Sequence, residues 1–378
     1  MHFDLNEEQR DTRLSARRFL REQVPSEKVR QWIATPEVLD KNIWRRIAEE
    51  LGWIGIPIPE AYGGFGFSWL EFGLILEECG RALLPAPVWT TAALGAGSIL
   101  ELGTPEQCEA LLPDVALGET IATLALTETG GKWNTQNLKT TFRKDGDDFV
   151  LSGTKTYVPW AHAAGLFVVI ARDANGELGA FAVPADTEGL TATRIATMDM
   201  TRPQGEVVLD NVRVPASARL TGADDAEAAL AQALHRASIL LSNELLGIAE
   251  AAMDYSVEYA KERVQFGKPI GSFQAIKHKC ANMLMMVEAC RSATWYAAWE
   301  AAQGEGFDLA ETAHITKGYA SDIAYRITAD SIQILGGIGI TWEHDAHFYF
   351  KRARASAMLL GNTSQHREAL YQEIIANS

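Results

Sequence analysis

The chain has 378 residues, of which 47% are hydrophobic and 22% are charged, and this composition predicts two or three packed globular domains. Its net charge of -15, without a basic cluster, argues against nucleic acid as the main partner. Its apolar stretches are shorter than the ~20 residues of a membrane span, and its start lacks a signal-peptide pattern. We therefore expect a cytoplasmic protein with no membrane partner.

Residues 1–118 are predicted to form an N-terminal helical domain. Asn6, followed three residues later by Gln9, is a capping box that begins a helix, and Pro25 ends that helix. A second capping-box signature begins at Ser68, and the apolar residues after it recur every three or four positions. This part of the chain therefore consists mainly of helices joined by turns.

Residues 119–224 are predicted to form a middle β domain, because the period of the apolar residues changes there. Asn175-Gly176 lies between two β-rich runs and predicts a type I′ hairpin turn. The expected strands cover residues 149–151, 166–171, 180–183 and 207–214.

Residues 225–378 are rich in alanine and leucine and contain no proline after Pro269, which predicts a bundle of long antiparallel helices. The order of helical, β and helical regions predicts a mostly helical α+β fold. Four cysteines without a CxxC pair argue against a zinc ribbon or a disulfide framework, so we expect reduced thiols. His344 and His347 could share a helix face, but they lack a further ligand at a definite spacing, so we expect no metal site.

The segment from Arg263 to Gln274 reads RVQFGKPIGSFQ and joins two of the long predicted helices. A guanidinium fork suits a diphosphate, and Gly267 with Pro269 predicts a tight turn. A second segment, QILGGIG at residues 333–339, contains glycines that permit close approach of a ligand to the backbone. It lacks the third glycine and the preceding strand of a dinucleotide-binding βαβ unit. The alternatives are a surface arginine beside a turn and a helix C-cap.

Two further segments lie in the predicted β domain: LTETGG at residues 126–131 and GTKTYV at residues 153–158. Together the four segments resemble the acyl-CoA dehydrogenase patterns R-x-x-F-G-x-x-I-x-x-F-Q, Q-x-x-G-G-x-G, L-T-E-P-x-x-G-S-D and G-x-K-x-W-I-T-N. The order and spacing of the segments extend the resemblance over essentially the whole chain. The chain departs from the last two patterns, because Trp133 replaces a serine and Pro159 replaces a flavin-binding threonine.

The resemblance implies an N-terminal helical domain, a middle β-barrel-like domain and a C-terminal four-helix bundle, assembled as a homo- or hetero-tetramer. It implies FAD as the cofactor, an acyl-CoA substrate and an electron-transferring flavoprotein as the electron acceptor. The reaction would be α,β-dehydrogenation of the thioester. The resemblance implies cofactor contacts at Leu126, Thr127, Tyr157, Val158, Arg263, Phe266, Gln274, Gln333, Gly336, Gly337, Thr363 and Gln365.

Removal of the α-proton requires a carboxylate whose pKa is raised toward the working pH. The position of that glutamate in many family members falls here on Leu360 or Gly361, and a second position used by other members falls on Ala237. None of these residues can accept a proton. Glu244 lies seven residues after Ala237, roughly two helical turns along, and is the nearest candidate for a relocated base.

The first hypothesis is therefore one subunit of a heteromeric acyl-CoA dehydrogenase, whose paralogous partner supplies the base and which acts in fatty-acid or steroid side-chain β-oxidation. The alternatives are a self-sufficient dehydrogenase that uses Glu244, a monooxygenase or oxidase of the same fold, and a non-catalytic binding subunit. The sequence does not define the acyl chain.

Overall fold

The computed structural model describes residues 5–303 and 309–376. The chain is mostly helical, with sheet confined largely to its middle third, and this confirms the predicted α+β class. The helices are α1 Glu7–Gln23, α2 Ser26–Ile33, α3 Lys41–Arg45, α4 Trp69–Arg81, α5 Gly97–Leu102, α6 Pro105–Ala116, α7 Ala226–Glu262, α8 Gln274–Ala301, α9 Leu309–Leu335, α10 Ala346–Ser356 and α11 Thr363–Ala376. The strands are β1 Ala122–Ala125, β2 Thr141–Asp145, β3 Asp148–Pro159, β4 Leu166–Arg172, β5 Leu178–Pro184, β6 Leu190–Ile195, β7 Gln204–Pro215, β8 Val264–Gln265 and β9 Lys268–Pro269.

The chain packs into two compact units. The helical unit comprises Met1–Gln31, Trp69–Leu84 and Ser238–Ser378, and the sheet unit comprises Trp32–Ser68 and Pro85–Ala237. Packing therefore joins the first helices of the chain to its C-terminal bundle. The predicted boundaries at residues 118 and 224 follow changes in composition instead, and they stay a prediction.

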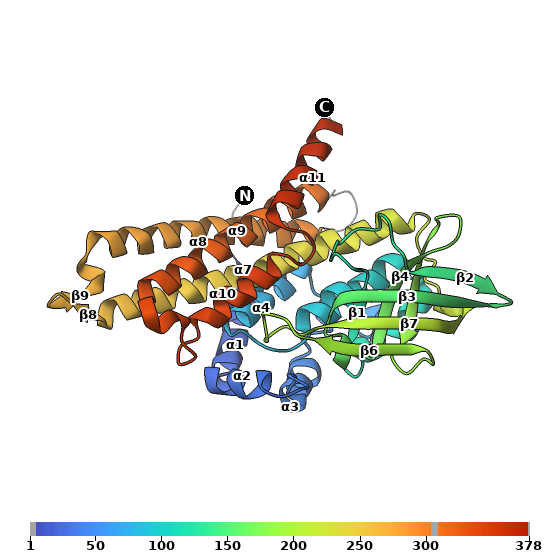
Figure 1. The fold of residues 1–378 in the computed structure, drawn as a ribbon, viewed down its shortest axis with the longest axis horizontal. Helices are drawn as coiled ribbons and strands as arrows, with labels where there is room; N and C mark the ends of the chain where they lie inside the picture. The colour runs from blue at the N-terminus through green and yellow to red at the C-terminus, as the bar shows by residue number, and fades with distance from the viewer. Residues whose placement is uncertain (1–4, 304–308, 377–378) are drawn as a thin grey trace. The chain divides into compact units, whose positions relative to one another are not determined.

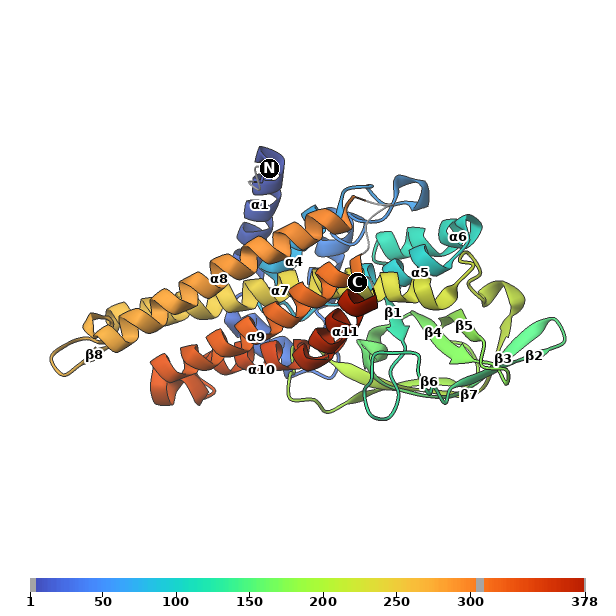
Figure 2. The ribbon, with the colours of Figure 1, turned by 90° about the horizontal axis from the view of Figure 1, so that it is seen from above.

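Three long helices dominate the helical unit: most of α7, all of α8 and the described α9 (Figures 1 and 2). α8 leads away from the β8–β9 ribbon, and α9 returns alongside it. The two helices have 28 and 27 residues, so each extends about 40 Å. This arrangement confirms the predicted bundle of long antiparallel helices.

The first helix has the predicted start. Asn6 Oδ1 accepts a hydrogen bond from the Gln9 backbone N–H at 2.8 Å, and the Gln9 side chain accepts one from the Asn6 N–H at 3.1 Å. α1 ends at Gln23, two residues before Pro25. α4 begins directly after Ser68, and ten of its thirteen residues are buried, which explains its apolar pattern.

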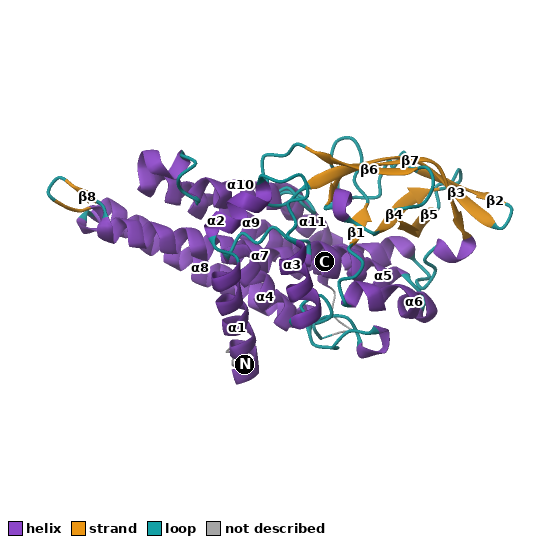
Figure 3. Ribbon diagram, turned by 90° about the horizontal axis from the view of Figure 1, so that it is seen from below, coloured by secondary structure: helices purple, strands orange, loops and turns teal. Residues whose placement is uncertain are grey.

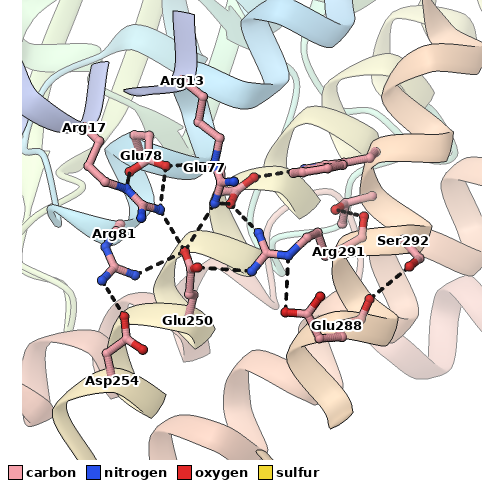
Figure 4. Close-up of polar contacts among 12 residues, drawn as sticks. Arg13, Arg17, Glu77, Glu78, Arg81, Glu250, Asp254, Glu288, Arg291 and Ser292 are labelled. Atoms are coloured by element: carbon pink, nitrogen blue, oxygen red, sulfur yellow. Dashed lines mark hydrogen bonds and ion pairs between the residues drawn. The ribbon is translucent and has the colours of Figure 1, made fainter. Parts of the chain in front are cut away.

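Two adjacent buried glutamates on α4 anchor this helix to its neighbours in the helical unit (Figure 4). Glu77 accepts hydrogen bonds from Arg13 at 2.6 Å and from Arg291 at 2.8 Å. Burial raises the pKa of the Glu77 carboxyl, and the two guanidinium groups oppose that rise. Glu78 accepts from Arg17 at 2.8 Å. α1 and α8 are thus joined to α4 by ion pairs to these two buried carboxylates.

The crossing of α4 and α7 is close because each helix presents a glycine to the other. A Cβ atom at Gly247 would lie 1.7 Å from the Glu77 carbonyl oxygen. A Cβ atom at Gly80 would lie 2.1 Å from the carbonyl oxygen of Glu244. Neither position can accept a side chain without moving the backbone, so the two helices are in direct main-chain contact.

The sheet unit contains a seven-stranded sheet whose main path is β1-β4-β2-β3-β7-β6, with β5 paired to β4 (Figure 3). β1 runs parallel to β4, whereas β4–β5, β2–β3, β3–β7 and β6–β7 are antiparallel. All four predicted strands are present, as parts of β3, β4, β5 and β7. Strands β1, β2 and β6 were not predicted.

The predicted type I′ turn at Asn175-Gly176 is wrong, although the hairpin exists. Gly176 has a positive φ of 87°, but Asn175 is not among the residues with positive φ, and a type I′ turn requires both. The loop is longer because the Asp173 carboxylate accepts hydrogen bonds from the backbone N–H groups of Asn175 and Glu177, at 2.9 and 2.7 Å.

The cysteines carry free thiols in the described chain: three are buried, and Cys280 is half-buried. Among the described residues, no helix has the length and hydropathy needed to cross a bilayer.

Candidate cofactor and substrate site

The turn between α7 and α8 exposes an aromatic side chain in a strained conformation. Val264 pairs with Pro269 and Gln265 with Lys268, leaving Phe266 and Gly267 as a two-residue loop. Phe266 has a φ of 53° and is 91% exposed. A left-handed conformation costs an aromatic residue about 1–2 kcal/mol. Contacts with water do not offset this backbone strain. We therefore interpret the loop as a binding element.

Arg263 begins this turn and leaves its guanidinium available. Its backbone N–H donates to the Tyr259 carbonyl at 2.8 Å, and its carbonyl accepts from Ile270 at 2.8 Å, so the main chain is held at both groups. The side chain is exposed and has no ion-pair partner among the described residues. Gln274 is the first residue of α8, and its side chain is exposed. A fixed backbone with a free guanidinium suits an anionic ligand such as a diphosphate.

The glycine segment follows the end of α9 and lies at the surface. Gly336 has a φ of 66°, and a Cβ atom at Gly336 or Gly337 would meet nothing within 4 Å. The exposed side chain of Gln333 lies one turn earlier, and Trp342 lies just beyond the segment, 60% exposed. The glycines are therefore not required by packing inside the chain. They leave room for a group that approaches the backbone from outside.

The arginine turn and the glycine segment lie at the same end of the helical unit. α8 begins at the β8–β9 ribbon. The antiparallel α9 runs back toward that end and stops at Leu335 (Figures 1 and 2). The two motifs therefore lie toward the same end of the helical unit, although residues 275–332 separate them in the chain.

The four expected flavin contacts of the sheet unit also lie together. The Thr127 carbonyl accepts a hydrogen bond from the Thr156 N–H at 2.8 Å, and the Thr127 hydroxyl donates to the Thr156 carbonyl. A register shift in the β3–β7 ladder falls between Lys155 and Val158, and Tyr157 within it has a φ of 56°. The bulge leaves Tyr157 44% exposed, whereas Leu126, Thr127 and Val158 are buried.

A buried ion pair supports this part of the sheet unit. Lys155 Nζ, fully buried, donates to Glu128 Oε1 at 2.9 Å and to the Leu126 carbonyl at 3.2 Å. Burial opposes ionisation of Glu128, but hydrogen bonds from Thr140 and Lys155 outweigh it and lower the pKa of Glu128 to about 2. Burial lowers the pKa of Lys155 to about 8. Both groups are therefore charged at neutral pH.

This pair predicts an acid-dependent loss of stability. The pKa of Glu128 is lower in the folded chain than its ordinary value of 4.5, so its stabilising contribution is present above pH 4.5 and is lost toward pH 2. Near pH 6, Glu128→Gln should lower the free energy of unfolding by about 3 kcal/mol, because Lys155 stays buried without its carboxylate. The difference from wild type should shrink as pH falls through this window. Urea unfolding at a series of pH values measures it, and a pH-independent difference would contradict the assignment.

Glu244, the candidate base, forms a buried ion pair. Its Oε1 accepts a hydrogen bond from Arg352 Nε on α10 at 2.9 Å, and both residues are almost fully buried. A carboxylate held by a buried guanidinium has little freedom to reach a substrate. The geometry is that of a structural pair, and a catalytic role for Glu244 stays a prediction.

The usual glutamate positions lie in a strained and well-held turn. Leu360 has a φ of 60° and Gly361 a φ of 104°, so both are in the left-handed region. The buried Lys317 on α9 donates to the Gly361 carbonyl at 3.3 Å and to the Ser321 hydroxyl at 3.1 Å. This turn is therefore fixed by the bundle. The other position, Ala237, is completely buried.

Thr363 and Gln365, the last two expected cofactor contacts, make hydrogen bonds within the chain. The Thr363 hydroxyl donates to Asp322 at 2.9 Å. Gln365 Oε1 accepts from the Asn362 N–H at 2.9 Å, while its own N–H donates to Asn362 Oδ1 at 3.0 Å. These contacts form a reciprocal cap at the start of α11.

Sequence reasoning did not identify Arg352, Lys317 or the Glu128–Lys155 pair as parts of these sites. A lysine or arginine on the apolar face of a helix is the signal that could have identified the first two, because such a residue must find a buried partner.

Comparisons with known proteins match almost the whole chain. The acyl-CoA dehydrogenase N-terminal domain matches residues 6–119, the middle domain residues 123–212 and the C-terminal domain residues 227–375. A probable acyl-CoA dehydrogenase of Bacillus subtilis, YngJ, is 32% identical over 99% of this chain and 100% of its own length.

Solved structures agree. A glutaryl-CoA dehydrogenase from Mycobacterium smegmatis in complex with FADH2 superposes with a TM-score of 0.90 at 26% identity, covering 98% of this chain and 95% of that one. The ChsE4–ChsE5 complex of Mycobacterium tuberculosis contains a chain that superposes with a TM-score of 0.89 at 25% identity, covering 99% of both.

The three matched domains and these relatives identify an FAD-dependent dehydrogenase, and the arginine turn and diglycine surface agree with that class. The residues fit the cofactor, because Arg263 has a free guanidinium and the glycines leave the backbone open. The protein belongs to the acyl-CoA dehydrogenase family. The bound flavin would accept the hydride, and the chain's own residues would hold and orient the cofactor.

Proposed function

We propose that this protein is one subunit of a heteromeric acyl-CoA dehydrogenase, in which a paralogous chain supplies the catalytic base. The main support is a contrast within the chain. The motif elements Arg263, Phe266 and Gly336–Gly337 are exposed, and no described part of the chain covers them. Leu360 and Gly361, where the base is expected, carry no ionisable group.

Two further observations support a division of roles between chains. The exposed arginine turn and glycine segment of this chain would contact a cofactor that is bound mainly to a neighbouring chain. Glu244, the alternative base, is bound to Arg352. The similar ChsE4–ChsE5 structure is itself a complex of two different chains.

Within this proposal, Arg263 would bind the cofactor diphosphate and the Gly336–Gly337 backbone would contact its adenosine. Thr127 and the exposed Tyr157 would lie beside the flavin ring. The substrate would be an acyl-CoA of the fatty-acid or steroid side-chain class, and an electron-transferring flavoprotein would accept the electrons. We place the complex in the cytoplasm.

The test is reconstitution. The chain should copurify with its paralogue, bind fewer flavins than there are chains, and dehydrogenate acyl-CoA only as the complex. Arg263→Met should weaken FAD retention by about 10–150-fold, the value of one charge-assisted hydrogen bond, while leaving assembly intact. Flavin absorbance after gel filtration measures retention.

Lys261→Met is the matched control, because Lys261 is an exposed cation at the end of the same helix and pairs with Glu258. It should leave FAD retention unchanged. A stable homotetramer that carries a flavin in every chain and turns over acyl-CoA without a partner would overturn the proposal.

A further inference from the structure

The helical unit contains a cleft that the proposed function does not use. It is formed by the end of α1, the start of α2, the end of α4, Tyr255 on α7 and the start of α10, and its volume is about 470 Å³. Small-molecule sites commonly occupy about 300–1,000 Å³. None of the residues expected to bind the cofactor lines it.

The floor of the cleft is apolar and its rim is charged. Leu20, Val24, Val29 and Leu83 are all buried beneath it, and Phe348 is buried at its α10 side. These side chains offer a surface to hydrocarbon and no partner to a sugar or a nucleobase. The part of a ligand that rests on this floor must therefore be apolar.

The charges on the rim leave one cation without a counter-ion. Two carboxylates line the cleft, and both are already neutralised: Glu78 by Arg13 and Arg17, and Asp345 by Arg30 (Figure 4 for Glu78). Arg21 lines the cleft, is exposed, and has no ion-pair partner among the described residues.

Two more guanidinium groups line the cleft, and both are paired with carboxylates. Arg17 and Arg81 line the cleft, and each also pairs with Glu250 at 3.1 Å (Figure 4). Arg21 therefore offers an anion a local partner on a chain whose net charge is -15 and whose surface as a whole repels anions.

We propose that this cleft binds an apolar carboxylic acid, with its carboxylate at Arg21 and its hydrocarbon chain on Leu20 and Leu83. One uncompensated guanidinium matches one carboxylate, whereas a polyphosphate would leave several charges over an apolar floor. A cation would be repelled at the rim. The proposal is independent of the heteromer, because it involves none of the residues assigned to the cofactor or to the base.

Occupancy of the cleft would bear on the ion pairs that hold the helical unit together. Arg17 and Arg81 connect α1 and α4 to Glu250 on α7, and Arg81 also pairs with Asp254 on α7 (Figure 4). A carboxylate at the rim competes with these acceptors. The site is thus placed to alter the contacts of α7 with its neighbours.

Calorimetric titration of the full-length protein with decanoate tests the proposal. Arg21→Glu should weaken decanoate binding by about tenfold, the effect of one surface charge contact. Ala82→Trp, which places an indole in the cleft from a half-buried position, should abolish it. Decanol, which has no charge, should bind more weakly than decanoate and should respond to Ala82→Trp but not to Arg21→Glu.

Arg18→Glu is the matched control, because Arg18 is exposed on the same helix and does not line the cleft. It should change decanoate affinity by less than about twofold. Absence of saturable binding, equal affinity in wild type and Arg21→Glu, or equal weakening by Arg18→Glu would each overturn the site. If Arg21→Glu or Ala82→Trp prevents folding, Arg21→Gln tests the same charge contact, because Arg21 lies at the surface. Flavin absorbance of each variant separates this result from any failure of the proposed cofactor site.

Discussion

Leu360→Glu is expected to raise acyl-CoA dehydrogenation by the chain alone by about 10²–10⁴-fold, the usual contribution of a general base. Leu360 already occupies a left-handed conformation, so a glutamate there adds no new backbone strain. Lys317 holds the following residue through the Gly361 carbonyl, which keeps the turn in place. Steady-state turnover of the flavin-loaded variant, without any partner chain, measures the gain.

Leu360→Gln is the control for this experiment, since it has similar size and polarity but no ionisable group. Gly361→Glu is the positional control: Gly361 has a φ of 104°, and its Cβ would lie 3.3 Å from His366 Nε2, so a side chain there is strained. Only Leu360→Glu should gain activity. Substantial turnover by the unmodified chain, or no gain in a flavin-loaded Leu360→Glu, would contradict the assignment.

Arg352→Met is expected to lower the free energy of unfolding by about 3–5 kcal/mol, because it removes the guanidinium that holds the buried Glu244 carboxylate. The double variant Glu244→Leu/Arg352→Met should recover most of that loss, since a packed apolar pair of similar size needs no counter-ion. Urea unfolding at one fixed protein concentration measures both values, because assembly makes stability depend on concentration.

Glu244→Gln separates structure from catalysis in the same series. If Glu244 is a structural residue, turnover of the reconstituted complex should be unchanged wherever the protein folds and keeps its flavin spectrum. Abolished turnover with an intact flavin spectrum would instead identify Glu244 as a relocated base. A double variant no more stable than Arg352→Met alone would show that the ion pair is not the reason for the loss.

The parts of the fold that sequence predicts well are those in which a local pattern and the packing agree. Asn6 and Gln9 cap α1 as expected because both partners of the capping box lie within one turn. The long helices α7 to α9 follow from uninterrupted apolar periodicity. Family resemblance adds the order of the regions, since its motifs cover the whole chain.

The missed strands have physical reasons. β1, Ala122–Ala125, is completely buried and two of its four residues are alanine, so it has neither alternation nor strong β propensity. β2, Thr141–Asp145, carries three polar residues in a row at its end and is identified only by its pairing with β3. β6, Leu190–Ile195, does alternate between exposed and partly buried residues, and its LTATRI sequence carries the signal of a strand.

The site was predictable as a set of motifs but not as a geometry. The exposed, strained conformation of Phe266 depends on a two-residue hairpin whose phenylalanine is not a usual turn residue. The pairing of Glu244 with Arg352 joins residues 108 positions apart, which a single sequence does not reveal. Arg291 and Glu77 are separated by 214 positions.

The glycine crossing between α4 and α7 limits how the helical unit can deform. At most helix contacts, side chains can change rotamer and let one helix slide past the other. At Gly80 and Gly247 there are no such side chains, and main chain rests on main chain. We therefore expect α4 and α7 to move together as a rigid pair. A displacement that begins near Arg81 would then be transmitted along α7 to the turn at Arg263.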